Sequence, residues 1–261
     1  MARRSTRPPA EGETDSLPFF TLLPNLVTML GLCAGLTAIR FVFSGNYQIA
    51  VMLVLFAVAI DGLDGLLARR LQATSEIGAQ LDSLSDFLNF GVVPGLLVYE
   101  FALASSERAG AWIAVLIYAS CCCLRLARFN VAHIRAQTAG TDSPRHFTGV
   151  PAPAGALMAL LPVYLSFEFG TELARAPILV ALWLVIVGFL MASRLPTFSP
   201  KTLRVPRTGI VWVMIALPFA VGIMLTRFWL SLVLIDAIYA VSLMYSALRV
   251  LMARRRSGAD G

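Results

Sequence analysis

Acidic side chains occur at helical spacing inside two neighbouring apolar segments, and this feature constrains the fold more than any other. Asp61 and Asp64 lie one helical turn apart near the end of one apolar segment. Asp82 and Asp86 lie one turn apart near the start of the next. Each pair therefore shares one face of its helix. A helical hairpin would bring the four carboxylates to face one another.

The composition shows which surroundings such carboxylates would have. Of the 261 residues, 58% are hydrophobic and 14% are charged, and the mean hydropathy is +0.77. These values exclude an ordinary soluble domain and predict an all-α integral membrane protein. Eight apolar segments of roughly 17 to 25 residues are each long enough to cross the hydrocarbon core. The expected spans are 22–43, 47–70, 78–103, 110–131, 152–168, 176–193, 209–226 and 229–250.

Four carboxylates in apolar surroundings need compensating positive charge. Arg69 and Arg70 are the basic residues between the two pairs, so roughly two negative charges stay unbalanced. A pair of divalent metal ions would balance them, and oxygen ligands favour Mg²⁺ or Mn²⁺ over zinc. Gly65 and Gly78 would permit close approach of a second helix or a ligand. Two such ions favour chemistry at phosphorus, and a site at a membrane boundary suggests a lipid substrate.

The basic residues predict the orientation of the chain. With a cytoplasmic N-terminus, 17 of the 21 Lys and Arg residues lie on the inner side, and the exceptions are Arg40, Arg108, Arg175 and Arg227. This asymmetry predicts a multi-pass protein of the inner (cytoplasmic) membrane with both termini in the cytoplasm. The Asp61–Asp86 hairpin would then lie near the cytoplasmic surface and receive cytosolic substrates.

Polar residues at the cytoplasmic ends of two other spans are candidates for substrate contact. Asn25 and Thr28, beside Pro24 at the expected start of the first span, could cap the helix or contact a phosphate group. Arg125 and Arg128 lie three residues apart at the end of the fourth span. They could anchor the helix at the membrane surface, but we favour a contact with a carboxylate or phosphate of the substrate, with Asn130 on the same turn.

The acidic pattern resembles a known family signature. Its order is Asp61-x2-Asp64-Gly65-x2-Ala68-Arg69-x8-Gly78-x3-Asp82-x3-Asp86. This arrangement resembles the CDP-alcohol phosphotransferase family at every defining position. The resemblance implies a core of six transmembrane helices. It also implies transfer of a phosphatidyl or related group from a CDP-linked donor to an alcohol, with release of CMP.

Three further segments favour one branch of that family. LRLARFN (124–130), FTGVPAPA (147–154) and SRLPTFS (193–199), with two spans beyond the six-helix core, resemble bacterial phosphatidylserine synthases. The donor would be CDP-diacylglycerol, the acceptor L-serine and the product phosphatidylserine. The expected partners are these substrates, membrane lipids and a second copy of the chain as a homodimer, with no nucleic acid.

The resemblance also implies roles for individual residues. Asp86 would accept the proton of the attacking hydroxyl, and Asn25 and Thr28 would meet the phosphates of the donor. Two Mg²⁺ or Mn²⁺ ions would be bound by Asp61, Asp64, Asp82 and Asp86. The CDP moiety would contact Gly65, Arg69, Ser75 and Gly78. We assign the carboxylate of serine to Arg125 and Arg128, with Asn130 nearby.

Composition and the resemblance together divide the chain into four parts, with tails that are polar at the N-terminus and basic at the C-terminus. These are a disordered cytoplasmic tail (1–17), the catalytic core (18–205), two additional transmembrane helices (206–252) and a basic cytoplasmic tail (253–261). The acceptor could instead be glycerol 3-phosphate, inositol phosphate or choline, because a phosphate would also suit the arginine pair. A divalent-cation transporter would need intramembrane carboxylates too, but it would require polar residues along a path to both membrane faces.

Overall fold

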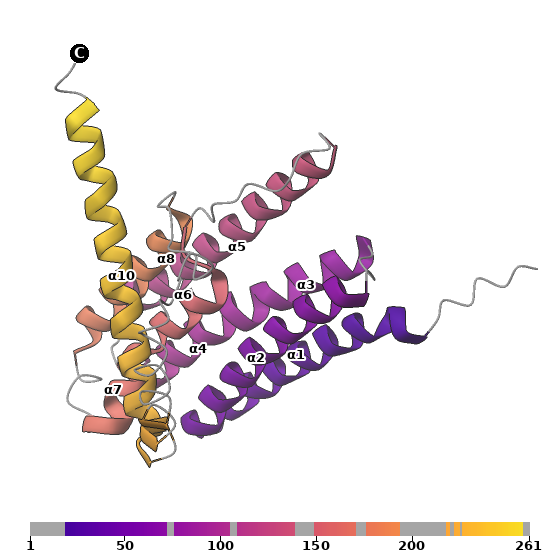
Figure 1. Ribbon diagram of the computed structural model, residues 1–261. Coiled ribbons are helices and arrows are strands. Elements are labelled where there is room, and N and C mark those ends of the chain that lie inside the picture. The colour runs from indigo at the N-terminus through magenta and orange to yellow at the C-terminus, as the bar shows by residue number, and fades with distance from the viewer. Residues whose placement is uncertain are drawn as a thin grey trace, which may run out of the picture.

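The computed structural model describes residues 19–71, 76–104, 109–138, 149–170, 176–193, 218–219, 222–224 and 226–257. Helices account for the regular structure in these ranges, which contain no strand (Figure 1). The prediction of an all-α membrane protein is confirmed. The elements are α1 (Phe19–Phe43), α2 (Tyr47–Leu71), α3 (Glu76–Asp86), η1 (Phe87–Val92), α4 (Val93–Val98), η2 (Tyr99–Leu103), α5 (Ala109–Thr138), α6 (Ala152–Ala159), α7 (Leu161–Phe169), α8 (Pro177–Ala192) and α10 (Phe228–Ser257).

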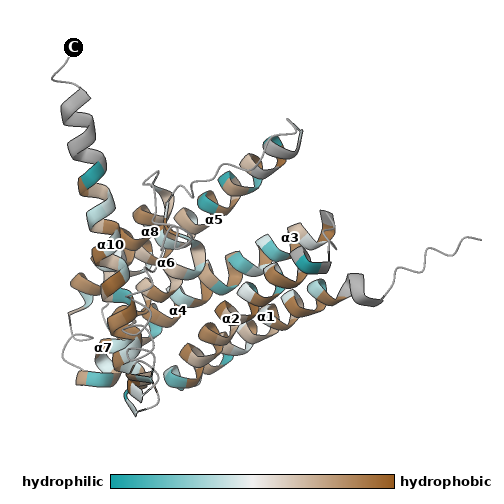
Figure 2. Cartoon of the chain, in the orientation of Figure 1, coloured by the Kyte–Doolittle hydropathy of each residue, from teal (hydrophilic) through white to brown (hydrophobic). Residues whose placement is uncertain are grey.

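Six stretches of the described helices are long and apolar enough to cross a membrane. They are Leu23–Phe43, Tyr47–Leu67, Ile77–Leu103, Gly110–Ala132, Ala152–Phe169 and Phe228–Arg249. Figure 2 shows brown, hydrophobic residues along most of their length. A shorter apolar helix, Pro177–Ala192, occupies the position expected for the sixth span. The expected span 209–226 lies largely outside the described residues, as does the tail 1–17.

Helix α5 extends further than the sequence predicts. The expected fourth span ends at residue 131, but the helix continues to Thr138, so the expected boundary is wrong over 132–138. This segment contains neither Gly nor Pro and includes Ala132 and Ala136, which favour helix. Because backbone hydrogen bonds within a helix need no tertiary partner, such a segment can project beyond the apolar part of the bundle.

Helices α1, α2 and α3 lie side by side, and α5 packs against α8 (Figure 1). A glycine permits the closest approach of α1 to the third span. A Cβ atom at Gly35 would collide with Oδ1 of the buried Asn89 in η1. On the other side of the third span, the buried Tyr118 of α5 donates a hydrogen bond of 2.6 Å to the carbonyl oxygen of Phe90. Both contacts fix the third span within the bundle.

The third span changes its helical geometry directly after Asp86. Residues Phe87–Val92 form a π-helical segment, and the N–H group of Val93 bonds to the carbonyl oxygen of Leu88. A π-helical turn adds a residue to the hydrogen-bonded ring and often marks a functional position. The insertion changes which side chains beyond Asp86 face α1, and the α-helical spacing assumed from sequence did not predict it.

Helix α10 begins at a well-defined contact with α7. Arg227, just before α10, forms an ion pair of 2.8 Å with Glu168 at the end of α7. Trp229 then packs against Phe167 with a ring-centroid distance of 4.7 Å and against Tyr164 at 6.4 Å. These aromatic contacts bury apolar surface and set which face of α10 is turned toward the bundle.

Candidate metal and substrate site

Polar residues from α1, α2, α3 and α5 gather at one end of the bundle. Successive spans run in opposite directions, so the end of α2 lies beside the start of α3 (Figure 1). The start of α1 and the end of α5 lie on the same side of the molecule. This topology brings together the carboxylates predicted to act together, and it explains why residues distant in sequence can share one site.

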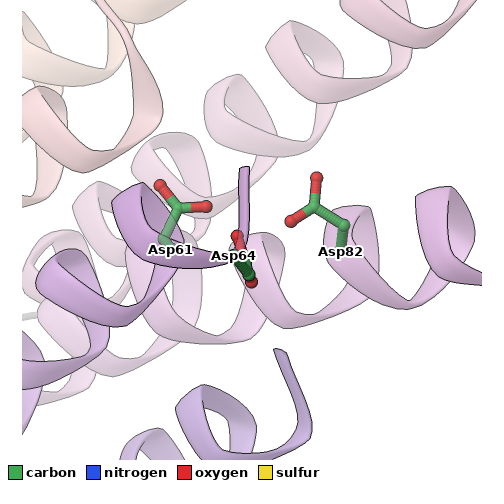
Figure 3. A group of neighbouring side chains, drawn as sticks. All are labelled: Asp61, Asp64 and Asp82. Atoms are coloured by element: carbon green, nitrogen blue, oxygen red, sulfur yellow. The ribbon is translucent and has the colours of Figure 1, made fainter. Parts of the chain in front are cut away.

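Three of the predicted metal ligands form a close group. One carboxylate oxygen from each of Asp61, Asp64 and Asp82 lies within 4.8 Å of the others. Asp64 is buried, with 5% of its surface exposed, and the other two side chains are half-buried. Figure 3 shows Asp61 on α2 and Asp82 on α3 directing their carboxylates toward a common space, with Asp64 between them.

Asp86 lies immediately beside this group. Its carboxyl group lies close to that of Asp61. Asp82 also acts on it electrostatically. The structure therefore brings all four predicted carboxylates together, with Asp86 next to the closer group formed by Asp61, Asp64 and Asp82. Arg125 on α5 is close enough to attract both Asp61 and Asp86.

The donor set of this cluster suits a hard divalent cation. Carboxylate oxygens are the ligands that Mg²⁺ and Mn²⁺ prefer. Four carboxylates lie together on buried or half-buried positions, and repulsion among them would oppose folding unless cations balanced their charge. In the described part of the chain, Arg125 is the cation found to act on Asp61 and Asp86. The residues are therefore compatible with bound Mg²⁺ or Mn²⁺.

Thr28 connects the first helix to the metal-ligand candidates. Its hydroxyl group donates a 2.8 Å hydrogen bond to Oδ2 of Asp64 and lies 3.1 Å from the carbonyl oxygen of Pro24. Because α1 begins at Phe19, the helix-cap interpretation of Asn25 and Thr28 is wrong. Thr28 is buried and orients Asp64, while Asn25 is half-buried one turn earlier.

The structure describes only some of the other residues that are predicted to bind the donor. A Cβ atom at Gly65 would meet no heavy atom of the described residues within 4 Å, so none of them fills the space beside this glycine. Gly78 lies in the first turn of α3, and Arg69 lies in the last turn of α2. The Arg69 side chain and the whole of Ser75 lie outside the described residues.

The three predicted acceptor-binding residues do not face the same partner. Arg125 faces the carboxylates, and its Nε atom is buried without a hydrogen-bond partner in the described structure. The guanidinium group of Arg128 is exposed and donates to the carbonyl oxygen of Ala192 at the end of α8. The Nδ2 atom of Asn130 donates to the Ser83 hydroxyl on α3, at 2.9 Å. Arg128 and Asn130 therefore join helices, which leaves Arg125 as the residue nearest the carboxylates.

Sequence reasoning missed two residues near this end of the bundle. Ser83 occupies the turn between the acidic residues of α3 and connects it to α5 through Asn130. Tyr239 on α10 lies near Arg125, although the sequence predicts only two additional transmembrane helices over 206–252. A single serine or tyrosine in a helix carries no spacing signal, so only the tertiary arrangement could identify them.

These observations define a class: a multi-pass helical membrane protein with a carboxylate cluster able to hold divalent cations at one end of its bundle. The family model for CDP-alcohol phosphatidyltransferases matches residues 21–193, and the chain belongs to this family. The matched segment contains the four carboxylates and Arg125, and it ends before α10.

Curated relatives are named CDP-diacylglycerol–serine O-phosphatidyltransferase. The protein of Mycobacterium leprae is 37% identical over 215 residues, which cover 82% of this chain and 71% of that protein. The protein of Mycobacterium bovis is 38% identical over 188 residues, covering 71% of this chain and 64% of its own length. The protein of Methanocaldococcus jannaschii is 30% identical over 224 residues, covering 84% and 92%. The chain thus spans about two thirds of the length of the mycobacterial relatives.

Proposed function

We propose that this protein transfers the phosphatidyl group of CDP-diacylglycerol to the hydroxyl of L-serine, giving phosphatidylserine and CMP. The observation that carries the proposal is the carboxylate cluster of α2 and α3, within a segment that matches the family model. The names of relatives at 30 to 38% identity support serine as the acceptor.

Asp61, Asp64 and Asp82, with Asp86 beside them, would hold two divalent ions, Mg²⁺ or Mn²⁺. Bound there, the ions would offset the charge of the donor diphosphate and stabilise the departing CMP. Thr28 holds Asp64 in place through its 2.8 Å hydrogen bond. A metal ligand whose second oxygen is fixed in this way needs less reorganisation when a cation binds.

The donor would lie along the ends of α1 and α2. Asn25, Gly65, Arg69, Ser75 and Gly78 would contact its nucleotide and phosphates. The space beside Gly65 supports this placement, since a side chain there would occupy it. Leu26, Met29, Leu30, Leu63 and Leu66 on the same two helices expose apolar side chains, which suit the acyl chains of a lipid.

Asp86 would accept the proton of the serine hydroxyl as its oxygen attacks the phosphorus atom. A general base must lie within hydrogen-bonding reach of that proton and beside the reacting centre. Asp86 borders the other three carboxylates and faces Arg125, so an acceptor between Asp86 and α5 would meet a base and a cation together. Arg125 would bind the serine carboxylate, with Arg128 and Asn130 holding α5 against its neighbours.

The basic residues of the sequence support an inner-membrane location with both termini and the site on the cytoplasmic side. We also propose a homodimer, as the family resemblance implies. Residues 18–205 would form the catalytic core and 206–252 two additional spans, between the tails 1–17 and 253–261.

The acceptor is tested with purified full-length protein in mixed micelles containing CDP-diacylglycerol and Mn²⁺. L-Serine, glycerol 3-phosphate, inositol phosphate and choline are supplied one at a time, and the lipid product is identified by mass spectrometry. We expect phosphatidylserine from serine and CMP in equal amount. A lipid formed from another acceptor, and none from serine, would contradict the proposal.

A further inference from the structure

Buried polar atoms without partners gather on the side of α10 that faces the bundle. Five side chains of the described structure contain such an atom, and four of them are Arg125, Tyr164, Asp236 and Tyr239. Buried polar groups in native proteins are nearly always hydrogen-bonded, so each exception calls for a partner. These four form two neighbouring pairs, because Tyr239 acts electrostatically on Arg125, and Asp236 acts on Tyr164.

The pair of Arg125 and Tyr239 borders the carboxylate cluster. Arg125 attracts Asp61 and Asp86 and also lies close to Tyr239. Its Nε atom and the Tyr239 hydroxyl are both buried and both lack a partner. Each is a hydrogen-bond donor. Both residues therefore keep an unused donor, Arg125 next to the base Asp86 and Tyr239 next to Arg125.

We propose that Tyr239 is an acceptor-specificity residue whose hydroxyl, together with Arg125 Nε, binds the carboxylate of an amino-acid acceptor. This inference rests on the proposed function. Serine carries its carboxylate and its hydroxyl on neighbouring carbon atoms, so a carboxylate held by α5 and α10 leaves the hydroxyl beside Asp86. Tyr239 lies beyond residue 193, so the selecting group comes from outside the segment that matches the family model.

The placement of Tyr239 depends on how α10 is held. The ion pair of Arg227 with Glu168 and the contacts of Trp229 fix the start of the helix on α7. Tyr239 follows on the same helix and packs against the apolar core. A helix fixed at this end presents the tyrosine at a set depth, so its hydroxyl needs no rearrangement to meet an acceptor.

The test compares Tyr239→Phe with Tyr164→Phe in the purified full-length protein. Each variant loses one buried hydroxyl that has no hydrogen-bond partner in the described structure. Tyr164 belongs to the pair with Asp236 and not to the pair with Arg125. We expect Tyr239→Phe to raise the KM for serine about tenfold, the usual effect of losing a hydrogen bond to a charged group. The KM for CDP-diacylglycerol and the metal requirement should stay unchanged, and Tyr164→Phe should resemble the wild type.

Ethanolamine, which is serine without its carboxylate, provides the second measurement. Its inhibition constant against serine should be the same in the wild type and in Tyr239→Phe, because it lacks the group that Tyr239 binds. An unchanged serine KM in Tyr239→Phe would overturn the inference while leaving the proposed function intact. So would an equal rise in both tyrosine variants, or a matching change for ethanolamine. A wild type that forms no lipid from serine would instead contradict the proposed function, and the carboxylate assignment with it.

Discussion

Buried aspartates occur in two regions of this molecule, and their surroundings differ. Asp64 belongs to a group of carboxylates on α2 and α3, where Thr28 donates to it and Arg125 lies nearby. Asp236 on α10 is equally buried, with 4% of its surface exposed, but Tyr164 is the ionisable neighbour found in the described structure. Burial alone therefore does not distinguish the two aspartates. We propose the group on α2 and α3 as the reactive centre, because it arranges several carboxylates around one space and Thr28 orients one of them.

Among the changes that distinguish the two regions, removal of divalent ions should lower the activity most. Chelation of Mg²⁺ and Mn²⁺ should abolish lipid formation, because the four carboxylates would then repel one another and the donor diphosphate. Readdition of either ion should restore activity, measured as CMP release. Full activity in the presence of excess chelator would show that the cluster holds no required cation.

Asp86→Asn should lower the rate of transfer by about a thousandfold, the range expected for loss of a general base. Asparagine has nearly the same shape but cannot accept a proton in this way. The rate is measured with saturating CDP-diacylglycerol and serine, and thermal unfolding checks that the protein remains folded. Near-normal turnover would exclude Asp86 as the base.

Thr28→Val should affect metal binding more than the rate at saturating metal. Valine keeps the shape of threonine but cannot donate to Asp64, and loss of a group that orients a ligand weakens metal binding by about tenfold or more. The Mn²⁺ concentration for half-maximal activity reports this effect. Thr37→Val is the matched control, because the Thr37 hydroxyl bonds to a carbonyl oxygen of its own helix. Equal shifts in the two variants would show that the Thr28–Asp64 bond is unimportant.

Asp236→Asn should have the smallest effect. This residue lies outside the carboxylate cluster, so transfer should stay within about threefold of the wild type, as for substitutions away from a functional site. The same assay as for Asp86→Asn gives a direct comparison of two buried aspartates. A loss as large as that of Asp86→Asn would show that α10 takes part in the reaction itself.

The two regions also differ in how far the sequence predicts them. The carboxylate cluster follows from local rules, since helical spacing sets each pair on one face and a short connection brings the pairs together. The interaction between Arg125 and Tyr239 joins residues more than a hundred positions apart. The sequence singles out Arg125 by its spacing from Arg128, but no pattern marks Tyr239. Helix boundaries were predicted well where hydropathy changes sharply. The predicted end of the fourth span was wrong over residues 132–138, because this polar segment is helical. Nothing in the sequence indicated the π-helical turn after Asp86.

The apolar side chains exposed beside the cluster, among them Leu26, Leu30 and Leu66, have a kinetic consequence for a diacyl donor. Its tails can stay among neighbouring lipids while only the headgroup enters the protein, so no energy is spent on extracting the molecule from the bilayer. The donor then reaches the site by lateral diffusion in the plane of the membrane. Turnover should follow the mole fraction of donor in the surface, and dilution with inert detergent at constant bulk concentration should slow it.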